Sequence, residues 1–159
     1  MPTPVFAEGE QDPVTQRALY HPVSTGFLSA MRAPLLEGRW FTDDDMRVAT
    51  GFVINQRLAR TIAPTGSALG KRITVRRSSQ ARADFGAPIT VPVIGVVGDM
   101  RQFGPTSESN PEVFLPYTLE VWPWMTFVVR TGAPATLVPA VERAVRVVEP
   151  GIEFLSKPN

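Results

Sequence analysis

Residues 71–97 read KRITVRRSSQARADFGAPITVPVIGVV, and this stretch decides the fold. Its first part, Lys71 to Arg77, alternates apolar Ile73 and Val75 with charged or polar neighbours, which is the pattern of a half-buried strand. Its last part, Ile89 to Val97, is rich in β-branched residues and predicts a second strand. A polar connection joins the two parts, so the stretch predicts a long β-hairpin.

Helices and further strands are expected on both sides of this hairpin. Asn55 ends a predicted strand over Gly51 to Asn55 and can cap a helix that runs to about Ala63. The longest helix is expected over Ala135 to Val148, where apolar residues recur at helical spacing. The remaining expected elements are strands over Ala18 to Val23, Glu112 to Tyr117, Met125 to Thr131 and Ile152 to Leu155, and a brief helix over Thr25 to Met31.

The composition predicts a strand-rich fold with many short elements. A chain of 159 residues is about one domain in length, and its 16 prolines and 12 glycines argue against a helical bundle. We therefore expect an α+β fold, with a mixed, mainly antiparallel sheet and two or three helices packed on it. Residues 1–17 show no periodicity and predict an irregular arm or an incomplete edge element, whereas residues 18–159 are expected to form the domain.

Charge, cysteine content and hydropathy exclude several classes of protein. The net charge is +1 with 19% charged residues, so neither disorder nor a strongly charged partner is implied. The absence of cysteine excludes disulfides, thiolate zinc sites and cysteine nucleophiles. The longest strongly apolar stretches, Val91 to Val97 and Phe127 to Val129, are far shorter than the roughly 20 residues that span a bilayer. The chain as given is therefore expected to be soluble.

The stretch TGSALGKRITV, Thr65 to Val75, resembles a phosphate-binding loop at first sight. Such a loop needs four residues between its glycine and the Gly-Lys pair, then Ser or Thr, and a following helix. Here Gly66 lies four positions before Gly70, Arg72 replaces the hydroxyl residue, and a strand pattern follows. The two glycines are better explained by positive φ angles in a helix-to-strand turn. No nucleotide or other cofactor is expected.

The polar residues form no convincing catalytic or metal-binding motif. His21 is the only histidine, and no serine lies in a G-x-S-x-G motif, so His21 is interpreted as a surface or edge residue. The three aspartates Asp43 to Asp45 lack the spacing of a calcium loop and predict a solvated turn or helix start. Asp99 and Arg101 follow a buried strand, where an aspartate more often caps a turn or pairs with an arginine. No catalytic and no metal-binding residue is assigned.

Two segments are candidates for partner contact. The hairpin carries Arg72, Arg76, Arg77 and Arg82, but without interleaved aromatic residues, so no nucleic-acid partner is expected. The segment Trp122-Pro123-Trp124 holds two large rings between predicted strands, where they either pack on the core or contact a protein. Exposed arginines and aromatics are enriched at interface centres, so Arg77, Arg82, Trp122 and Trp124 are the predicted contact residues.

Seven blocks in order extend over nearly the whole chain and carry a family resemblance. The blocks are VSTGFLSAMRAPLLEGRWFTDDD (23–45), VINQRLARTIAP (53–64), GSALGKRITV (66–75), VIGVVGDMRQFG (93–104), EVFLPY (112–117), MTFVVRT (125–131) and LVPAVERAVRVVEP (137–150). In this order the chain resembles the MacB-like periplasmic core domain of FtsX-type ABC transporter permeases.

The resemblance implies a location and a mechanical role. Such a domain lies outside the membrane, between the first and second transmembrane helices, so this chain is expected to be an excised extracytoplasmic segment whose upstream strand and helix are incomplete. It implies a non-catalytic part that transmits ATP-driven motion to substrate handling or to a partner protein. The implied partners are a cytoplasmic ATPase subunit or domain acting through the membrane part, a membrane adaptor protein, and a second copy in a homodimeric permease.

The residues leave one alternative of another class open. A free-standing small-molecule-binding or hydrolytic α+β domain would use Asp99, Arg101 and His21 around a pocket. Hydrophobic segments of about 20 residues flanking this stretch in the full-length protein would favour the permease interpretation.

Overall fold

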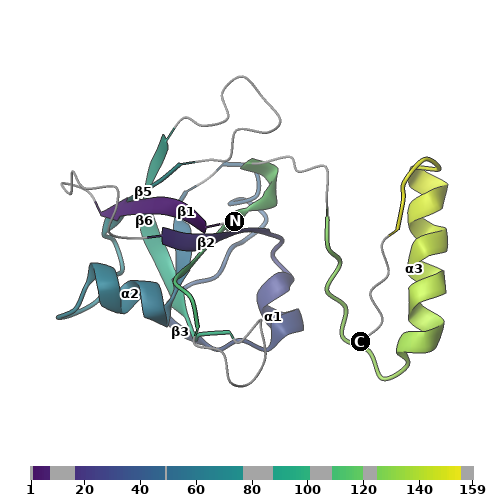
Figure 1. The fold of residues 1–159 in the computed structure, drawn as a ribbon, viewed down its shortest axis with the longest axis horizontal. Coiled ribbons are helices and arrows are strands. Elements are labelled where there is room, and N and C mark those ends of the chain that lie inside the picture. The colour runs from purple at the N-terminus through teal and green to yellow at the C-terminus, as the bar shows by residue number, and fades with distance from the viewer. Residues whose placement is uncertain are drawn as a thin grey trace. The chain divides into compact units, whose positions relative to one another are not determined.

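The computed structural model describes residues 2–7, 17–48, 50–76, 88–100, 109–119 and 125–154. The chain divides into two compact units, Met1–Phe127 and Val128–Asn159. Within the described residues, all strands belong to the first unit, the sheet unit, and the second unit holds one long helix (Figure 1).

In the described residues, short strands are interspersed with three α-helices and one 3₁₀-helix. The elements are β1 (Pro2–Ala7), β2 (Arg17–Val23), α1 (Phe27–Met31), β3 (Leu35–Gly38), β4 (Phe52–Asn55), α2 (Gln56–Ile62), β5 (Arg72–Arg76), β6 (Pro88–Val97), β7 (Glu112–Pro116), the 3₁₀-helix η1 (Tyr117–Leu119) and α3 (Pro134–Val148).

The sheet is built around β6, the longest strand. Its first half pairs antiparallel with β5, and its second half pairs parallel with β4 and antiparallel with β3. From β4 the pairings continue through β7, β2 and β1 to β5, which leads back to β6. Of the seven described strand pairs only β2–β7 and β4–β6 are parallel. The predicted mixed, mainly antiparallel sheet and its long β5–β6 hairpin are confirmed.

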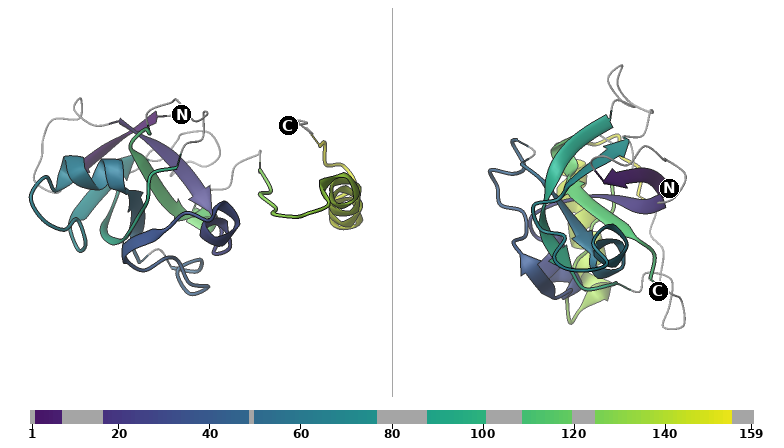
Figure 2. Two further views of the ribbon diagram at one scale, coloured as in Figure 1. Left: turned by 90° about the horizontal axis from the view of Figure 1, so that it is seen from below. Right: turned by 90° about the vertical axis from the view of Figure 1, so that its left-hand side faces the viewer.

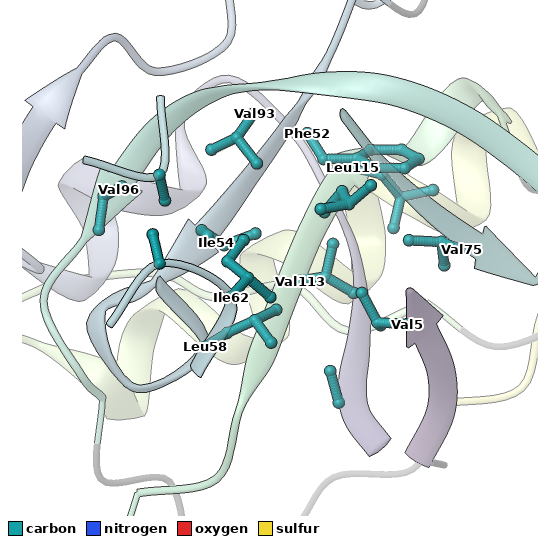
Figure 3. Packing of buried hydrophobic residues seen from close by; sticks show 14 residues of the cluster. Val5, Phe52, Ile54, Leu58, Ile62, Val75, Val93, Val96, Val113 and Leu115 are labelled. Atoms are coloured by element: carbon teal, nitrogen blue, oxygen red, sulfur yellow. The ribbon is translucent and has the colours of Figure 1, made fainter. Parts of the chain in front are cut away.

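Two hydrophobic clusters occupy the two faces of the central strands. Phe52 and Ile54 of β4 point into the larger cluster, which also holds Leu58 and Ile62 of α2 (Figure 3). Val53, between them, points into the smaller cluster. Because both faces of β4 are buried, its sequence is continuously apolar up to Asn55 rather than alternating.

The two short helices cover the sheet unit from opposite sides. Figure 1 and the left view of Figure 2 both place α2 and α1 at opposite ends of this unit. Leu58 and Ile62 anchor α2 in the larger cluster, and Phe27, Leu28 and Met31 of α1 pack against the smaller one. Both helices were expected, and α2 begins where Asn55 was predicted to cap it.

Of the two alternatives for residues 1–17, an irregular arm does not describe Pro2–Ala7, which forms the strand β1. Residues Pro2 to Pro4 pair with β2, and Val5 to Ala7 pair with β5, so β1 joins two strands that are otherwise apart. Val5 is buried in the larger cluster. The pairing partners lie far away in sequence, and two prolines interrupt the local pattern, which is why the segment alone does not show a strand.

Two further strand predictions are also wrong. Residues 125–131 have no regular structure, and residues 152–154 are not a strand, although residue 155 lies outside the described residues. Both segments contain β-branched and aromatic residues that favour strands. A strand also needs a neighbour to pair its backbone, and no described strand pairs with either segment.

Candidate functional site

In the turn between α2 and β5, backbone amides donate hydrogen bonds to acceptors within the protein. Gly66 and Gly70 have positive φ angles of 120° and 77°, as the turn interpretation predicts. The Gly70 amide donates to the Val93 carbonyl at 2.9 Å, and the Leu69 amide donates to the Ser67 hydroxyl at 3.1 Å. A strand, β5, follows instead of a helix. The turn interpretation is therefore confirmed, and the phosphate-loop interpretation fails.

His21 lies beside a buried carboxylate that sequence reasoning missed. Its Nε2 lies 3.5 Å from Oε1 of Glu112, and its ring stacks on Phe114 with centroids 5.3 Å apart. The parallel β2–β7 pairing creates this arrangement, since His21 is in register with Phe114. The His21 side chain is only 23% exposed and that of Glu112 1%. His21 is thus part of a packed strand pair, and only the register could have shown this.

Asp99 is engaged at the start of α2. Its Oδ1 accepts a hydrogen bond of 2.8 Å from the backbone amide of Arg57. Among the described residues, Asp99 and His21 have different partners, on α2 and on β7 respectively. Arg101, the third residue of the alternative interpretation, lies outside the described residues. The described residues therefore show no contact that joins Asp99 to His21.

Asp45 differs from its two acidic neighbours. All three lie in a turn, as predicted, and Asp43 and Asp44 are exposed, but the prediction of a solvated residue is wrong for Asp45, which is buried. Its carboxylate accepts hydrogen bonds from Arg39 at 2.6 and 3.0 Å and from the Thr42 amide at 2.8 Å. The Arg39 guanidinium holds the pKa of Asp45 well below its usual range.

No group of three or more metal-ligating side chains occurs in the described ranges. This covers Asp43 to Asp45, where the buried carboxylate already has an arginine as its counter-charge. The turn is therefore held by internal hydrogen bonds, which stabilise its conformation.

The four predicted contact residues lie outside the described residues. Arg77 and Arg82 belong to the connection after Arg76, the last residue of β5, and Trp122 and Trp124 follow η1. Their role in partner contact stays a prediction.

Comparison with known proteins assigns the family. The model of the MacB-like periplasmic core domain matches residues 3–147, which include all of the described strands except Pro2, the first residue of β1. The chain belongs to this family. It is thus an extracytoplasmic domain of a MacB-like ABC transporter permease. In the part of the chain that the structure describes, no helix is long and apolar enough to cross a membrane.

Solved structures share the fold of this MacB-like domain at low sequence identity. The periplasmic region of MacB from Actinobacillus actinomycetemcomitans matches 93% of the chain with a TM-score of 0.62 and 13% identity. A domain assigned to a permease protein from Porphyromonas gingivalis matches 96% with a TM-score of 0.59 and 18% identity. The extracellular domain of the noncanonic ABC-type transporter YknZ from Gram-positive bacteria matches 75% with a TM-score of 0.52 and 20% identity.

The chain is shorter than these solved regions. It spans 63% of the MacB region, 51% of the YknZ domain and 67% of the Porphyromonas gingivalis domain. No protein with a curated description matches the chain in sequence.

Proposed function

We propose that this domain is a non-catalytic part of its permease that transmits ATP-driven motion to substrate handling or to a partner protein. The observation that supports this most is the family match over residues 3–147. In this proposal ATP is hydrolysed by a cytoplasmic ATPase subunit or domain, and the motion reaches the domain through the membrane part. The permease acts as a homodimer, and a membrane adaptor protein is the candidate external partner.

The construction of the sheet unit supports a mechanical role. Both faces of the central strands carry fully buried side chains. One face holds Phe52, Ile54, Val113 and Leu115, and the other holds Val53 and Phe114. Close-packed interiors are hardly compressible and transmit strain. A unit built in this way moves as a rigid body when it is pushed at one side, as a transmitting element requires.

The experiment that tests this role measures motion in the full-length permease. The chain contains no cysteine, so Thr61→Cys, on the exposed side of α2, gives one spin label in each protomer without a background signal from this domain. We expect the distance between the two labels to change when the permease with its ATPase is trapped with ATP. An unchanged distance distribution in the actively transporting complex would overturn the proposal.

Two controls make the result specific. A doubly labelled protomer with Arg32→Cys and Thr61→Cys, mixed with an excess of unlabelled protomer, reports within the sheet unit and should keep its distance, since both residues belong to one unit. The same labels in a complex whose ATPase cannot hydrolyse ATP should show no cycling between states.

A further inference from the structure

Strand β3 is the free edge of the described sheet. Every other described strand pairs with at least two strands, whereas β3 pairs only with β6. The pairings from β6 through β4, β7, β2 and β1 to β5 return to β6, so they close on themselves and leave β3 outside. All four of its residues, Leu35–Gly38, are exposed. An edge strand of this kind presents backbone N–H and C=O groups to which a further strand can pair.

The middle of this edge is apolar. Leu35 and Leu36 are 42% and 44% exposed, although leucine is among the residues most often found buried. They are consecutive in the strand, so one lies on each face of the sheet. A strand that paired with β3 would bring its own side chains next to both leucines and would remove apolar surface from water.

Opposite charges lie at the two ends of this edge. Arg32 precedes β3 by three positions, and Glu37 is the third residue of the strand. Both are exposed, and neither forms an ion pair with another described residue. The Glu37 carboxylate accepts a hydrogen bond from the Ser67 hydroxyl, which is neutral. The nearby Arg39 does not compensate Glu37, because its guanidinium donates to Asp45 at 2.6 and 3.0 Å.

The backbone fixes the position of Arg32 beside the strand. Arg32 ends α1 in the left-handed conformation, with φ 53° and ψ 29°. Its amide donates to the Ser29 carbonyl at 3.2 Å, and the Ala33 amide donates to the Leu28 carbonyl at 3.3 Å. Glycine is the usual residue at such a position, because a Cβ disfavours this conformation. The chain thus keeps a positive charge at a fixed place beside β3, where glycine would be more favourable.

We propose that β3 is a contact between two copies of this chain, in which the two β3 strands pair antiparallel about a twofold axis. In an antiparallel pair the beginning of each strand lies beside the end of the other. Each Arg32 therefore lies near the Glu37 of the second copy, and the leucines of both strands lie between the two ion pairs. The twofold axis closes the assembly, because each β3 covers the free edge of the other.

Charge complementarity favours a second copy over other strands. A charged residue on an edge strand disfavours pairing with most strands, and like charges opposite each other destabilise a strand pair. An in-register parallel pair would place Arg32 beside Arg32 and Glu37 beside Glu37. The antiparallel pair of two identical strands is the arrangement that joins opposite charges at both ends.

This inference rests on one part of the proposed function, the homodimeric permease, and names a surface on which its two copies meet. It does not depend on the transmission of motion. If the copies do not meet at β3, the spin-label distance can still change with ATP. If that distance stays constant, the copies can still pair through β3.

The test is sedimentation velocity with the 159-residue chain from about 0.01 to about 1 mM at low salt. Because the contact is one short strand pair, we expect a weak dimer with a Kd on the order of 0.1 mM. Arg32→Glu alone and Glu37→Arg alone should each weaken dimerisation at least about tenfold, since like charges then meet at both ends. Their circular dichroism spectra and Tm should match those of the original chain.

An equimolar mixture of the two variants is the decisive sample. Arg32→Glu and Glu37→Arg chains should form a heterodimer about as tight as the original dimer, because a carboxylate and a guanidinium meet again at both ends. Only a contact between copies gives this recovery, since neither chain changes when the other is added. A mixture that dimerises no better than the single variants would overturn the proposal.

Matched variants separate this contact from net charge. Arg143→Glu and Asp43→Arg make the same charge changes at exposed positions elsewhere, and each should dimerise like the original chain. A chain that stays monomeric at about 1 mM would contradict the proposed contact. So would equal dimerisation of Arg32→Glu and the original chain, which would place the contact elsewhere, for example on α3.

Discussion

At the residue scale, Asp45 is the clearest example of a polar residue with a structural role. Its neighbour Asp44 carries the same side chain one position away, but Asp44 is 93% exposed and Asp45 is 2% exposed. The difference arises because Arg39 and Thr42 converge on Asp45. A charge that is buried with its hydrogen-bond partners is costly to disrupt, whereas an exposed one contributes little.

We expect Asp45→Asn to lower the free energy of unfolding by about 2 kcal/mol at neutral pH, because Arg39 loses its charged partner. Arg39 is half-exposed, so solvent screening keeps the loss at this level. Urea denaturation measures the change. Asp44→Asn is the control, and it should stay within about 0.5 kcal/mol of the original chain.

The stabilisation by Asp45 should also depend on pH. Its folded pKa is lowered, so its contribution is fully present above the unfolded pKa of about 4 and is lost progressively as the pH falls from there through the lowered folded pKa. The difference in unfolding free energy between Asp45→Asn and the original chain should therefore become smaller between neutral pH and about pH 3. A difference that stays constant over this range would contradict the assignment.

Asn55 connects three segments with one buried amide. Its Oδ1 accepts from the Leu58 amide at 3.0 Å and from the Glu112 amide at 2.9 Å, and its Nδ2 donates to the Asn110 carbonyl at 2.8 Å. The side chain thus caps α2 and fixes the start of β7 at the same time.

Asn55→Ala should destabilise the chain by about 3 kcal/mol, because it leaves two buried backbone amides without an acceptor. Thermal and urea unfolding measure the loss. Thr61→Ala in the same helix removes only an exposed hydroxyl that bonds to the Arg57 carbonyl, and should be nearly neutral. Similar losses in the two variants would show that the helix, and not the Asn55 network, limits stability.

At the element scale, the close approach of β3 and its following residues to β6 depends on a glycine. A Cβ at Gly95 would lie 2.2 Å from the Arg39 carbonyl oxygen, which is backbone and cannot rotate away. Arg39 itself donates its amide to the Ile94 carbonyl at 3.0 Å. The absence of a side chain at Gly95 therefore allows this backbone to pack against β6.

Gly95→Ala is expected to cost about 1 to 3 kcal/mol and to increase hydrogen exchange at the Arg39 amide, because the two backbones must separate. Gly26→Ala is the matched control in the same unit, since a Cβ there meets nothing within 4 Å. If Gly95→Ala had the same free energy of unfolding as Gly26→Ala, the close approach of the two backbones would not require glycine at position 95.

At the scale of the whole molecule, the described hydrophobic core belongs to one unit. The buried apolar side chains run from Val5 to Leu115, all within Met1–Phe127. The second unit contains α3, whose Val138 and Val148 are 49% and 83% exposed. The sheet unit therefore has the core of an independently folding domain.

A chain that ends at Phe127 should still unfold cooperatively, with a Tm within about 4 °C of the 159-residue chain. Calorimetry measures this. Removal of residues 1–7 should instead abolish the cooperative transition, because β1 closes the path from β2 to β5 and contributes Val5 to the core. If the chain without residues 1–7 were more stable than the chain that ends at Phe127, this division of the chain would be contradicted.

The sequence by itself determined the elements that carry a local signal. Periodicity, β-branching and capping predicted the hairpin, β4, β7, α3 and α2 with its Asn55 cap. These signals depend only on residues that are neighbours in the sequence. The ordered blocks were also enough to indicate the family that the comparison confirmed.

Only the tertiary structure decided the features that depend on distant partners. Four features depend on which distant segment lies next to the residues concerned. They are the strand at Pro2–Ala7, the absence of a strand at residues 125–131, the His21–Glu112 pair and the burial of Asp45. The physical reason is that a strand or a buried charge is stable only with a partner, and pairing across long sequence separations leaves no mark in the local pattern.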